Sequence, residues 1–468
     1  MQTQADTHRC RNGGLMQDIN LSGKTNLLEQ DPYDYELQNV AKPELFREMF
    51  PYTETPKIAF NYRVVPRNMP EDIFITDTSF RDGQQSRAPY TPEQMVHIYK
   101  LLHKLGGKKG MIRQTEFFVY SEKDRKALEK CLELDYDFPE CTTWIRASKK
   151  DFDLVHSIGV KETGILVSCS DYHIFRKMNM TRQQAMNQYL GIVSDCIEAG
   201  LRPRCHFEDI TRADFYGFVV PFARALMQIS EDSGVPVKIR ACDTMGFGVP
   251  YPGVALPRSV SGIIYGLQHY AGVPSEMLEW HGHNDFYKGV VNATTAWMYG
   301  AGAVNCSLLG IGERTGNVPL EAMIFEYASL RGTMNGMRPE VITEIADYIQ
   351  HETGYDIPPM TPFAGENFNL TRAGIHADGL MKDPEIYNIF DTDTILNRPP
   401  KVSITSTSGV AGIACWVNAY FEKLGKPPVA KTDPLVQKMY AWVREQYNGG
   451  RITMISDEEM EKLVGEIK

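Results

Sequence analysis

Eight short stretches rich in β-forming residues alternate with amphipathic stretches along the middle of this chain. They begin at Asp72, Met111, Thr142, Thr163, Arg202, Val237, Leu278 and Val304. Strands that alternate with helices indicate a parallel sheet, and eight such units within about 265 residues fit a closed barrel. A doubly wound open sheet is the alternative, because alternation alone does not require closure. The sequence therefore predicts an α/β fold with a (β/α)8 TIM barrel over residues 71–335.

The stretch after the first predicted strand carries a clear helix start. Thr91 precedes Pro92, and Gln94 follows three residues after Thr91, which makes a capping box with proline at the first helical position. Apolar residues then recur at helical spacing at Met95, Ile98, Tyr99, Leu101, Leu102 and Leu105. The pattern predicts a helix that buries this face.

Two flanking segments complete the predicted organisation. Residues 1–70 are polar, rich in Pro, Tyr and Asn, and show no sustained period. We expect them to form an N-terminal arm that wraps the barrel or a partner subunit. Residues 336–468 are expected to form a mostly helical C-terminal appendage.

Composition excludes several classes of function. Of the 468 residues, 43% are hydrophobic and 23% are charged, as in ordinary globular proteins. The net charge of -10 argues against a nucleic-acid partner. No apolar run approaches the ~18 residues that cross a bilayer, and the first residues lack the apolar segment of a secretory signal. We expect a cytoplasmic protein with no membrane or nucleic-acid partner.

The nine cysteines are odd in number, scattered, and form no Cys-x-x-Cys pair. This pattern predicts neither a disulfide framework nor a thiolate zinc site. Cys205 and Cys242 lie within three residues of Glu208 and Thr244 along their predicted strands. A thiol facing the barrel mouth would react with thiol reagents, whereas inert packing is the alternative, since burial raises thiol pKa values.

Polar residues gather where the predicted strands end, and these ends carry the reactive groups of a barrel. The seventh strand ends in His281 and His283, which point to the same side because they are two residues apart. The first strand ends in Arg81 and Asp82, for which a structural ion pair is the alternative. Two imidazoles and one carboxylate leave coordination positions open, which is typical of a catalytic metal site.

Further polar residues follow the fifth and eighth predicted strands. The glycine-rich turn Gly310–Asn317 (GIGERTGN) lets the backbone approach a ligand, and a plain tight turn is the alternative. Arg204 and Arg212 lie on and after the fifth strand. Arginines at a barrel mouth suit a substrate with several carboxylates, and salt bridging at the rim is the alternative.

The motifs DTSFRDGQQ, HGHND and GIGERTGN occur in this order along the chain. Together they resemble the metal-dependent acyltransferases and lyases that share an aspartate-arginine motif on the first strand. This family includes the isopropylmalate, homocitrate and citramalate synthases and the hydroxymethylglutaryl-CoA lyases. The resemblance extends from about Pro70 to Tyr420. The lyases lack the C-terminal appendage, so its presence favours a synthase.

The resemblance implies a role for each matching residue. The implied metal ligands are Asp82, His281, His283 and Asn317. The implied substrate-binding residues are Gln85, Arg204, Arg212 and Thr244, and the implied catalytic residues are Arg81, Glu208, His376 and Tyr387. CoA is expected at Gly312 and Glu313. The family also implies a divalent cofactor, Mn2+ first and Co2+, Mg2+ or Zn2+ as alternatives, and a homodimer whose appendage reaches the neighbouring active site.

Within this family, the stretches PYTETPKIAFNYRVVPRNMP, DTSFRDGQQSRAPYTPEQ and RQTEFFVYSEKDR look like those of citrate synthases of Re stereospecificity. That resemblance implies the reaction of acetyl-CoA, oxaloacetate and water to citrate and CoA, a step of the tricarboxylic acid cycle. Homocitrate, isopropylmalate or citramalate synthesis is the alternative, and lyase chemistry is a second one. A non-catalytic sensor is disfavoured, because Arg81, Glu208 and His376 are all present.

The sequence departs from the wider family at three places. Thr115–Tyr120 reads TEFFVY where isopropylmalate synthases carry glycine and proline, and the bulkier Phe117 and Phe118 disfavour a branched oxo acid. Thr405–Gly409 stands where many synthases have His-Ser-Gly. About sixty residues follow Gly409, which is too few for a leucine-sensing domain.

Overall fold

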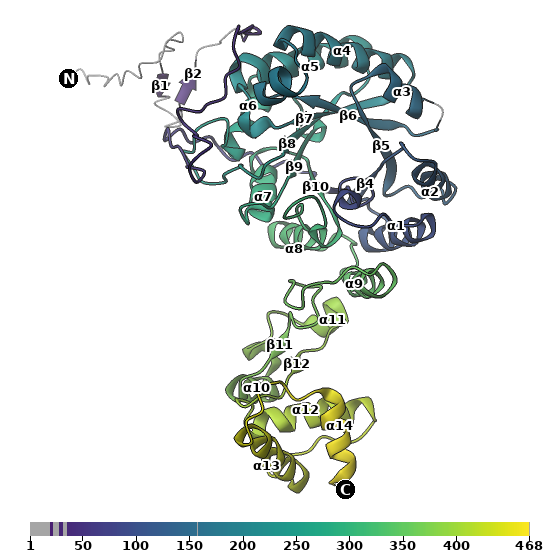
Figure 1. Ribbon diagram of the computed structural model, residues 1–468, viewed down its shortest axis with the longest axis vertical. Helices are drawn as coiled ribbons and strands as arrows, with labels where there is room; N and C mark the ends of the chain where they lie inside the picture. The colour runs from purple at the N-terminus through teal and green to yellow at the C-terminus, as the bar shows by residue number, and fades with distance from the viewer. Residues whose placement is uncertain (1–18, 22–27, 31–34, 157, 468) are drawn as a thin grey trace, which may run out of the picture. The chain divides into compact units, whose positions relative to one another are not determined.

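The computed structural model describes residues 19–21, 28–30, 35–156 and 158–467 (Figure 1). The described chain divides into two compact units, one centred on Ile145–Val304 and one made of Phe74–Trp144 and the residues from Asn305 onward. Eight strands from the two units form a closed barrel in the order β10-β3-β4-β5-β6-β7-β8-β9. This closure confirms the predicted TIM barrel and excludes the open-sheet alternative.

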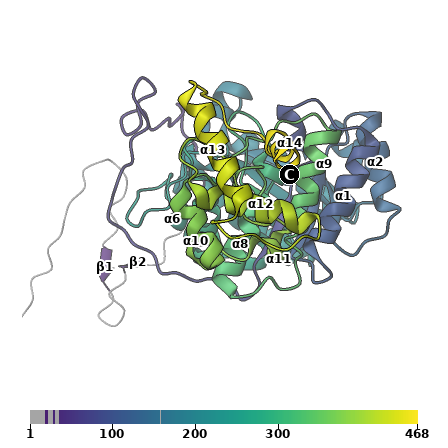
Figure 2. The same ribbon diagram turned by 90° about the horizontal axis from the view of Figure 1, so that it is seen from below.

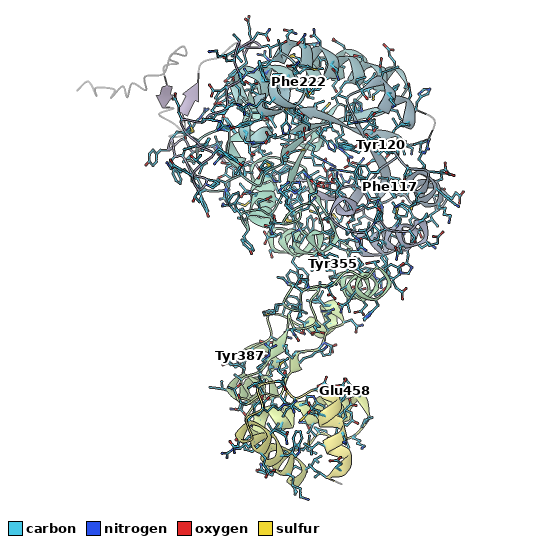
Figure 3. All side chains as sticks on the ribbon, in the orientation of Figure 1. Phe117, Tyr120, Phe222, Tyr355, Tyr387 and Glu458 are labelled. Carbon is cyan, nitrogen blue, oxygen red and sulfur yellow. The ribbon has the colours of Figure 1, made fainter. Side chains whose placement is uncertain are left out.

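The unit centred on Ile145–Val304 contains four neighbouring parallel strands. They are β6 (Glu162–Ser168), β7 (Arg202–Glu208), β8 (Lys238–Asp243) and β9 (Leu278–Gly282). Their helices are α3 (Lys149–Val155), α4 (Arg182–Glu198), α5 (Val220–Ser233), α6 (Val260–His269) and α7 (Gly289–Tyr299). Each strand is buried on both faces, as parallel strands covered by helices are. Phe222 of α5, which is labelled in Figure 3, stacks for example on Phe207 of β7 with ring centroids 5.0 Å apart.

The other unit contains most of the remaining barrel. Its strands are β3 (Phe74–Asp77), β4 (Ile112–Phe117), most of β5 (Glu140–Arg146) and the end of β10 (Ala303–Cys306). Its barrel helices are α1 (Pro92–Gly106), α2 (Glu122–Leu132) and α8 (Leu320–Arg331). The predicted capping box begins α1: Thr91 Oγ1 accepts from Gln94 N at 3.2 Å, and Gln94 Oε1 accepts from Thr91 N at 2.9 Å. All six apolar residues predicted on this helix are buried, so the periodicity identified the correct face.

The C-terminal part of this unit is mostly helical, as predicted. Its elements are α9 (Val341–Glu352), β11 (Leu370–Thr371), α10 (Gly374–Lys382), α11 (Thr392–Leu396), β12 (Lys401–Val402), α12 (Val410–Lys423), α13 (Pro434–Asn448) and α14 (Asp457–Glu466). Helices α10, α12, α13 and α14 lie together around a small apolar core (Figure 2). Ile413, Val417 and Met439 are fully buried in that core.

The described residues of the predicted N-terminal arm contact the unit centred on Ile145–Val304. Strands β1 (Ile19–Leu21) and β2 (Leu28–Gln30) pair with each other, whereas residues 1–18, 22–27 and 31–34 lie outside the described residues. Asn61 N and Tyr62 N each donate to Gly253 O at 3.0 Å. This segment therefore packs on the loop that follows β8. None of the described helices has both the length and the hydrophobicity of a membrane span.

Candidate metal centre and active site

Asp82, His281 and His283 form one buried group of possible metal ligands. One ligand atom from each residue lies within 4.8 Å of the others. The two imidazoles come from the carboxyl end of β9, with ring centroids 5.2 Å apart and planes at 82°. Two imidazoles and one carboxylate at this spacing fit a single divalent ion with positions left for substrate.

Asn317 supports this fit from the glycine-rich turn. Its Nδ2 donates to Asp82 Oδ2 at 2.7 Å. Its Oδ1 is buried and accepts no hydrogen bond from a described residue. A buried amide oxygen without a donor suits a cation, for which carbonyl oxygens are common ligands. Gly312 makes the arrangement possible, because a Cβ at this position would lie 1.9 Å from Asn317 Oδ1.

Arg81 is held beside Asp82 by three contacts. Its Nε donates to Glu116 Oε2 at 2.8 Å, and its Nη1 lies 3.6 Å from Asp82 Oδ1. Its guanidinium lies 5.5 Å from the centre of the Trp144 ring system. Arg81 is 8% exposed, so its positive charge is fixed in place. Sequence reasoning missed Glu116 as its partner, although this residue lies within the TEFFVY motif.

Glu208 ends β7 and is surrounded by groups from the end of β6. Its Oε2 lies 2.9 Å from His173 Nδ1 and accepts a short hydrogen bond from Ser168 Oγ. Its Oε1 lies 3.2 Å from Lys177 Nζ. Burial acts to raise the pKa of Glu208, but His173, Lys177 and Ser168 outweigh it and lower the pKa to about 2. Glu208 is therefore a carboxylate at neutral pH.

His173 and Lys177 were missed by sequence reasoning. Both lie on a single π-helical turn, η2 (Tyr172–Lys177), directly after β6. Such turns often occur at functional sites. The only signal in the sequence was their position after the end of a predicted strand, which many residues share.

Thr244 and Arg212 meet around Asp209 at the ends of β7 and β8. Asp209 has a left-handed backbone with φ 65°, and its N donates to Thr244 Oγ1 at 2.8 Å. Arg212, in the short helix η3 (Ile210–Arg212), donates through Nε to both Asp209 carboxylate oxygens at 2.9 and 3.0 Å. Two predicted substrate-binding residues therefore lie together, on the side of the barrel where substrates bind.

Arg204 lies in a different environment. It is 1% exposed, its Nη1 donates to Glu162 Oε1 at 2.9 Å, and its Nε lies 3.8 Å from Glu279 Oε2. Arg240 on the next strand donates to Glu279 Oε2 at 2.7 Å. The structure thus shows Arg204 in buried ion pairs in the first half of β7. Its role with a substrate carboxylate stays a prediction.

Among the remaining predicted residues near the barrel motifs, Gln85 and Glu313 are solvent-facing, whereas Gly312 is buried. Gln85, in the short helix η1 (Gly83–Ser86), is exposed, and its N donates to Asp82 O at 3.1 Å. Glu313 is exposed. Its carbonyl oxygen accepts a hydrogen bond from Gly316 N at 2.9 Å, which closes the turn. The two exposed positions are accessible to a ligand, and the predicted roles of all three residues stay predictions.

His376 and Tyr387 form a pair in the C-terminal region. Tyr387, which is labelled in Figure 3, follows the short helix η7 (Pro384–Ile386). Its ring centroid lies 4.3 Å from that of His376 on α10. Both side chains are exposed. Among the described residues, no hydrogen bond or ring contact joins either of them to Arg81 or Asn317.

The described cysteines are all free thiols, while Cys10 lies outside the described residues. Cys205 is fully buried and Cys242 is 5% exposed. Burial raises the pKa of the Cys205 thiol well above its ordinary value. These observations favour inert packing over a reactive thiol at the barrel mouth.

Comparison with known proteins places these features in a family. Residues 72–349 match the HMGL-like protein family. The chain is 56% identical over 435 residues to the citrate (Re)-synthase of Clostridium kluyveri, covering 93% of this chain and 96% of that protein. It is 54% identical over 430 residues to the citrate (Re)-synthase of Syntrophus aciditrophicus, covering 92% and 68%.

One further relative and one solved structure are less similar. The 2-phosphinomethylmalate synthase of Streptomyces hygroscopicus is 37% identical over 435 residues, covering 92% of this chain and 97% of that protein. The solved HMG-CoA lyase of Bacillus subtilis gives a TM-score of 0.49 at 17% identity, covering 62% of this chain and 96% of that one. The chain therefore belongs to the HMGL-like family, in the group of synthases that includes the citrate (Re)-synthases.

Proposed function

We propose that this protein is an acyltransferase of the citrate (Re)-synthase type, which converts acetyl-CoA, oxaloacetate and water to citrate and CoA. The observation that carries the proposal is the buried group of Asp82, His281 and His283 beside Arg81. It occurs in a chain that is 56% identical to a citrate (Re)-synthase over 96% of that protein.

A divalent ion fits between Asp82, His281 and His283. Asn317 holds the Asp82 carboxylate in place. Such an ion, for which manganese is our first expectation and cobalt, magnesium and zinc are alternatives, supplies a Lewis acid that polarises a keto group. Arg81 stabilises the negative charge that develops on the keto oxygen, because a fixed guanidinium needs no reorganisation during the reaction. Glu116 keeps this guanidinium oriented.

The oxaloacetate carboxylates are assigned to Thr244, Arg212 and Gln85, whereas Arg204 is engaged in buried ion pairs with Glu162 and Glu279. Thr244 and Arg212 lie together around Asp209 and are the best supported of the three. The thioester of acetyl-CoA is assigned to the turn at Gly312 and Glu313, where glycine lets the backbone approach closely.

The acetyl methyl group holds its protons tightly, so condensation needs a base and a stabilised enolate. We assign the base to His376, with Tyr387 against its ring. Glu208 assists as a carboxylate, since its pKa is lowered to about 2. The new carbon–carbon bond joins the acetyl methyl carbon to the keto carbon, and water then cleaves the thioester to release CoA.

We further propose a homodimer in which His376 and Tyr387 serve the active site of the neighbouring subunit. Their exposure supports this arrangement, because exposed side chains are open to a second subunit. Coexpressing the inactive variants Asp82→Ala and His376→Ala tests it, because a mixed dimer would contain one complete active site. Activity regained only in the mixture supports the shared site, and a fully inactive mixture contradicts it.

A substrate panel tests the reaction. Thiol release is measured with acetyl-CoA, manganese and, in turn, oxaloacetate, 2-oxoglutarate, 2-oxoisovalerate and pyruvate. We expect the highest kcat/KM with oxaloacetate, and citrate as the product. A clear preference for another oxo acid would assign the chain to homocitrate, isopropylmalate or citramalate synthesis instead.

A further inference from the structure

Arg258 is a buried guanidinium that forms no ion pair with a described carboxylate. It is 6% exposed and lies between two rings, 3.6 Å from the Phe50 centroid and 4.4 Å from the Phe247 centroid. Its Nη1 donates to Lys57 O at 3.2 Å. Its Nε is buried and has no hydrogen-bond partner, and within the described chain no ion pair involves this residue.

A buried charge in this state is unfavourable unless something neutralises it. Burial lowers the pKa of Arg258 to about 10, opposed by Asp243 and assisted by the nearby Arg212. The group is therefore still protonated at neutral pH. Among the described carboxylates only Asp243 acts on this charge, and it does so without ion-pair contact, which indicates that an anion from outside the chain completes the site.

Arg212 lies near the same Phe247 ring as Arg258 and is more open to solvent. Its guanidinium is 4.3 Å from the Tyr172 ring centroid and 6.0 Å from the Phe247 centroid. Its side chain is 20% exposed. Its hydrogen bonds to Asp209 use Nε alone, and no hydrogen bond to a described side chain uses its two terminal amino groups. Those groups are available to a ligand.

The elements that carry these side chains meet on one face of the barrel. Tyr172 follows β6, Arg212 follows β7, and Phe247 and Arg258 lie in the loop that follows β8. All three positions are at the carboxyl ends of parallel strands, which is where (β/α)8 barrels bind their substrates. The Phe247 ring also stacks on Phe286 at 5.7 Å, which extends the aromatic surface.

We propose that Arg212 and Arg258 bind an anionic group of a substrate, with Tyr172 and Phe247 as the aromatic walls of the site. Two planar guanidinium groups favour a carboxylate or phosphate, because each presents several N–H groups to such an oxyanion. The inference rests on the proposed function, which supplies both sources of this anion. The source is a carboxylate of oxaloacetate or a phosphate of acetyl-CoA.

A purely structural role for Arg258 would explain part of the geometry. Its contacts with Phe50 and Lys57 O connect the N-terminal segment to the loop after β8. That role does not require a positive charge, because an apolar side chain of similar length also packs between two rings. Replacing the charge while keeping the length therefore separates the two explanations.

The test compares Arg258→Met and Arg212→Met with the unaltered protein and with Arg176→Met. Arg176 is exposed and lies 5.9 Å from the same Tyr172 ring, which makes it a matched control outside the pair. We expect KM for one substrate to rise about tenfold or more in both test variants, with kcat changed less than about threefold. A rise in KM for oxaloacetate identifies the carboxylate, and a rise for acetyl-CoA identifies the phosphate.

Calorimetric binding of citrate and of adenosine 3′,5′-bisphosphate accompanies the kinetics. Loss of binding of either anion in Arg258→Met supports the site even if the substrate panel rejects citrate synthesis, so the two proposals fail separately. If Arg258→Met does not fold, Arg212→Met and Arg258→Lys carry the test, the latter because it keeps the charge but loses the planar group. Folded variants with unchanged KM values and unchanged binding of both anions would overturn the proposal.

Discussion

Buried arginines lie at both ends of strands β6–β9, but their surroundings differ. In the first half of the strands, Arg204 pairs with Glu162 at 2.9 Å and Arg240 pairs with Glu279 at 2.7 Å. Beyond the carboxyl ends, Arg258 is similarly buried and forms no ion pair with a described residue. The first set fills the barrel interior with matched charges, whereas the second leaves a positive charge for a ligand.

Strand register explains the matched set. Arg240 lies directly opposite Glu279 in the β8–β9 pairing. Glu162 lies opposite Arg202 in the β6–β7 pairing, and Arg204, two residues further along β7, points to the same side as Arg202 and also reaches Glu162. Opposite charges on neighbouring strands meet because parallel strands are only about 5 Å apart. The loop that carries Arg258 is not part of a strand pairing, so the groups that surround Arg258 are set by loop packing. The comparison therefore separates charges that the barrel itself neutralises from a charge that it does not.

The largest expected effect comes from removing a ligand of the metal centre while leaving the matched charges intact. His281→Ala should lower kcat/KM by about a thousandfold, because a Lewis acid contributes several kcal/mol to the reaction. Steady-state kinetics and metal content by mass spectrometry measure the effect. His351→Ala, an exposed position on α9, is the control and should change neither quantity. Full activity in His281→Ala would contradict the assignment of the centre.

The next prediction removes one member of the buried ion pairs Arg204–Glu162 and Arg240–Glu279. Glu162→Gln leaves Arg204 without one partner and should lower the free energy of unfolding by about 3–5 kcal/mol, as removal of one member of a buried pair does. Arg258→Met should change it by less than about 1 kcal/mol, since it removes a buried charge that is in ion-pair contact with no described residue. Urea unfolding measures both. Equal losses in the two variants would remove the distinction between the two ends of the barrel.

A third prediction concerns Glu208, the last residue of β7. Its pKa is lowered from 4.5 to about 2 in the folded protein, so folding favours the carboxylate. The resulting stability, about 2–3 kcal/mol, is fully present above pH 4.5 and is lost as the pH falls towards 2. The stability difference between the unaltered protein and Glu208→Gln should therefore shrink below pH 4.5. Urea unfolding at several pH values checks this, with the exposed Glu313→Gln as the control.

The smallest effect is a difference in thiol labelling. Cys205 lies beside Arg204 on β7, is fully buried, and has a raised pKa. Iodoacetamide should label it only after unfolding, whereas the partly exposed Cys415 should be labelled earlier. Mass mapping of timed samples measures the order. Early labelling of Cys205 would show that solvent reaches the interior among the matched charges.

Much of the fold could be predicted from the sequence. All eight barrel strands and the start of α1 followed from hydrophobic periodicity and capping residues, which are local properties of the chain. The proximity of His281 and His283 could also be predicted from local sequence, because residues two positions apart on a strand point to the same side. Asp82 came from its motif and from the general position of active sites in barrels.

The partners of these residues could not be predicted in the same way. Glu116 lies 35 positions from Arg81, and His173 lies on a different strand-end turn from Glu208. The sequence indicates which residues follow strands, but it does not indicate which side chains meet across neighbouring loops. Arg258 was missed for a related reason, since its ring contact with Phe50 joins segments 208 residues apart. Such contacts depend on packing rather than on period.

The contact between Arg258 and Phe50 also bears on protein engineering. Phe50 and Lys57 precede the first barrel strand, yet one flanks the guanidinium and the other accepts its hydrogen bond. An excised barrel starting at β3 would keep every strand while losing a wall behind the anion site. Grafting this substrate preference onto another barrel scaffold would therefore require transplanting the preceding segment as well as the loops.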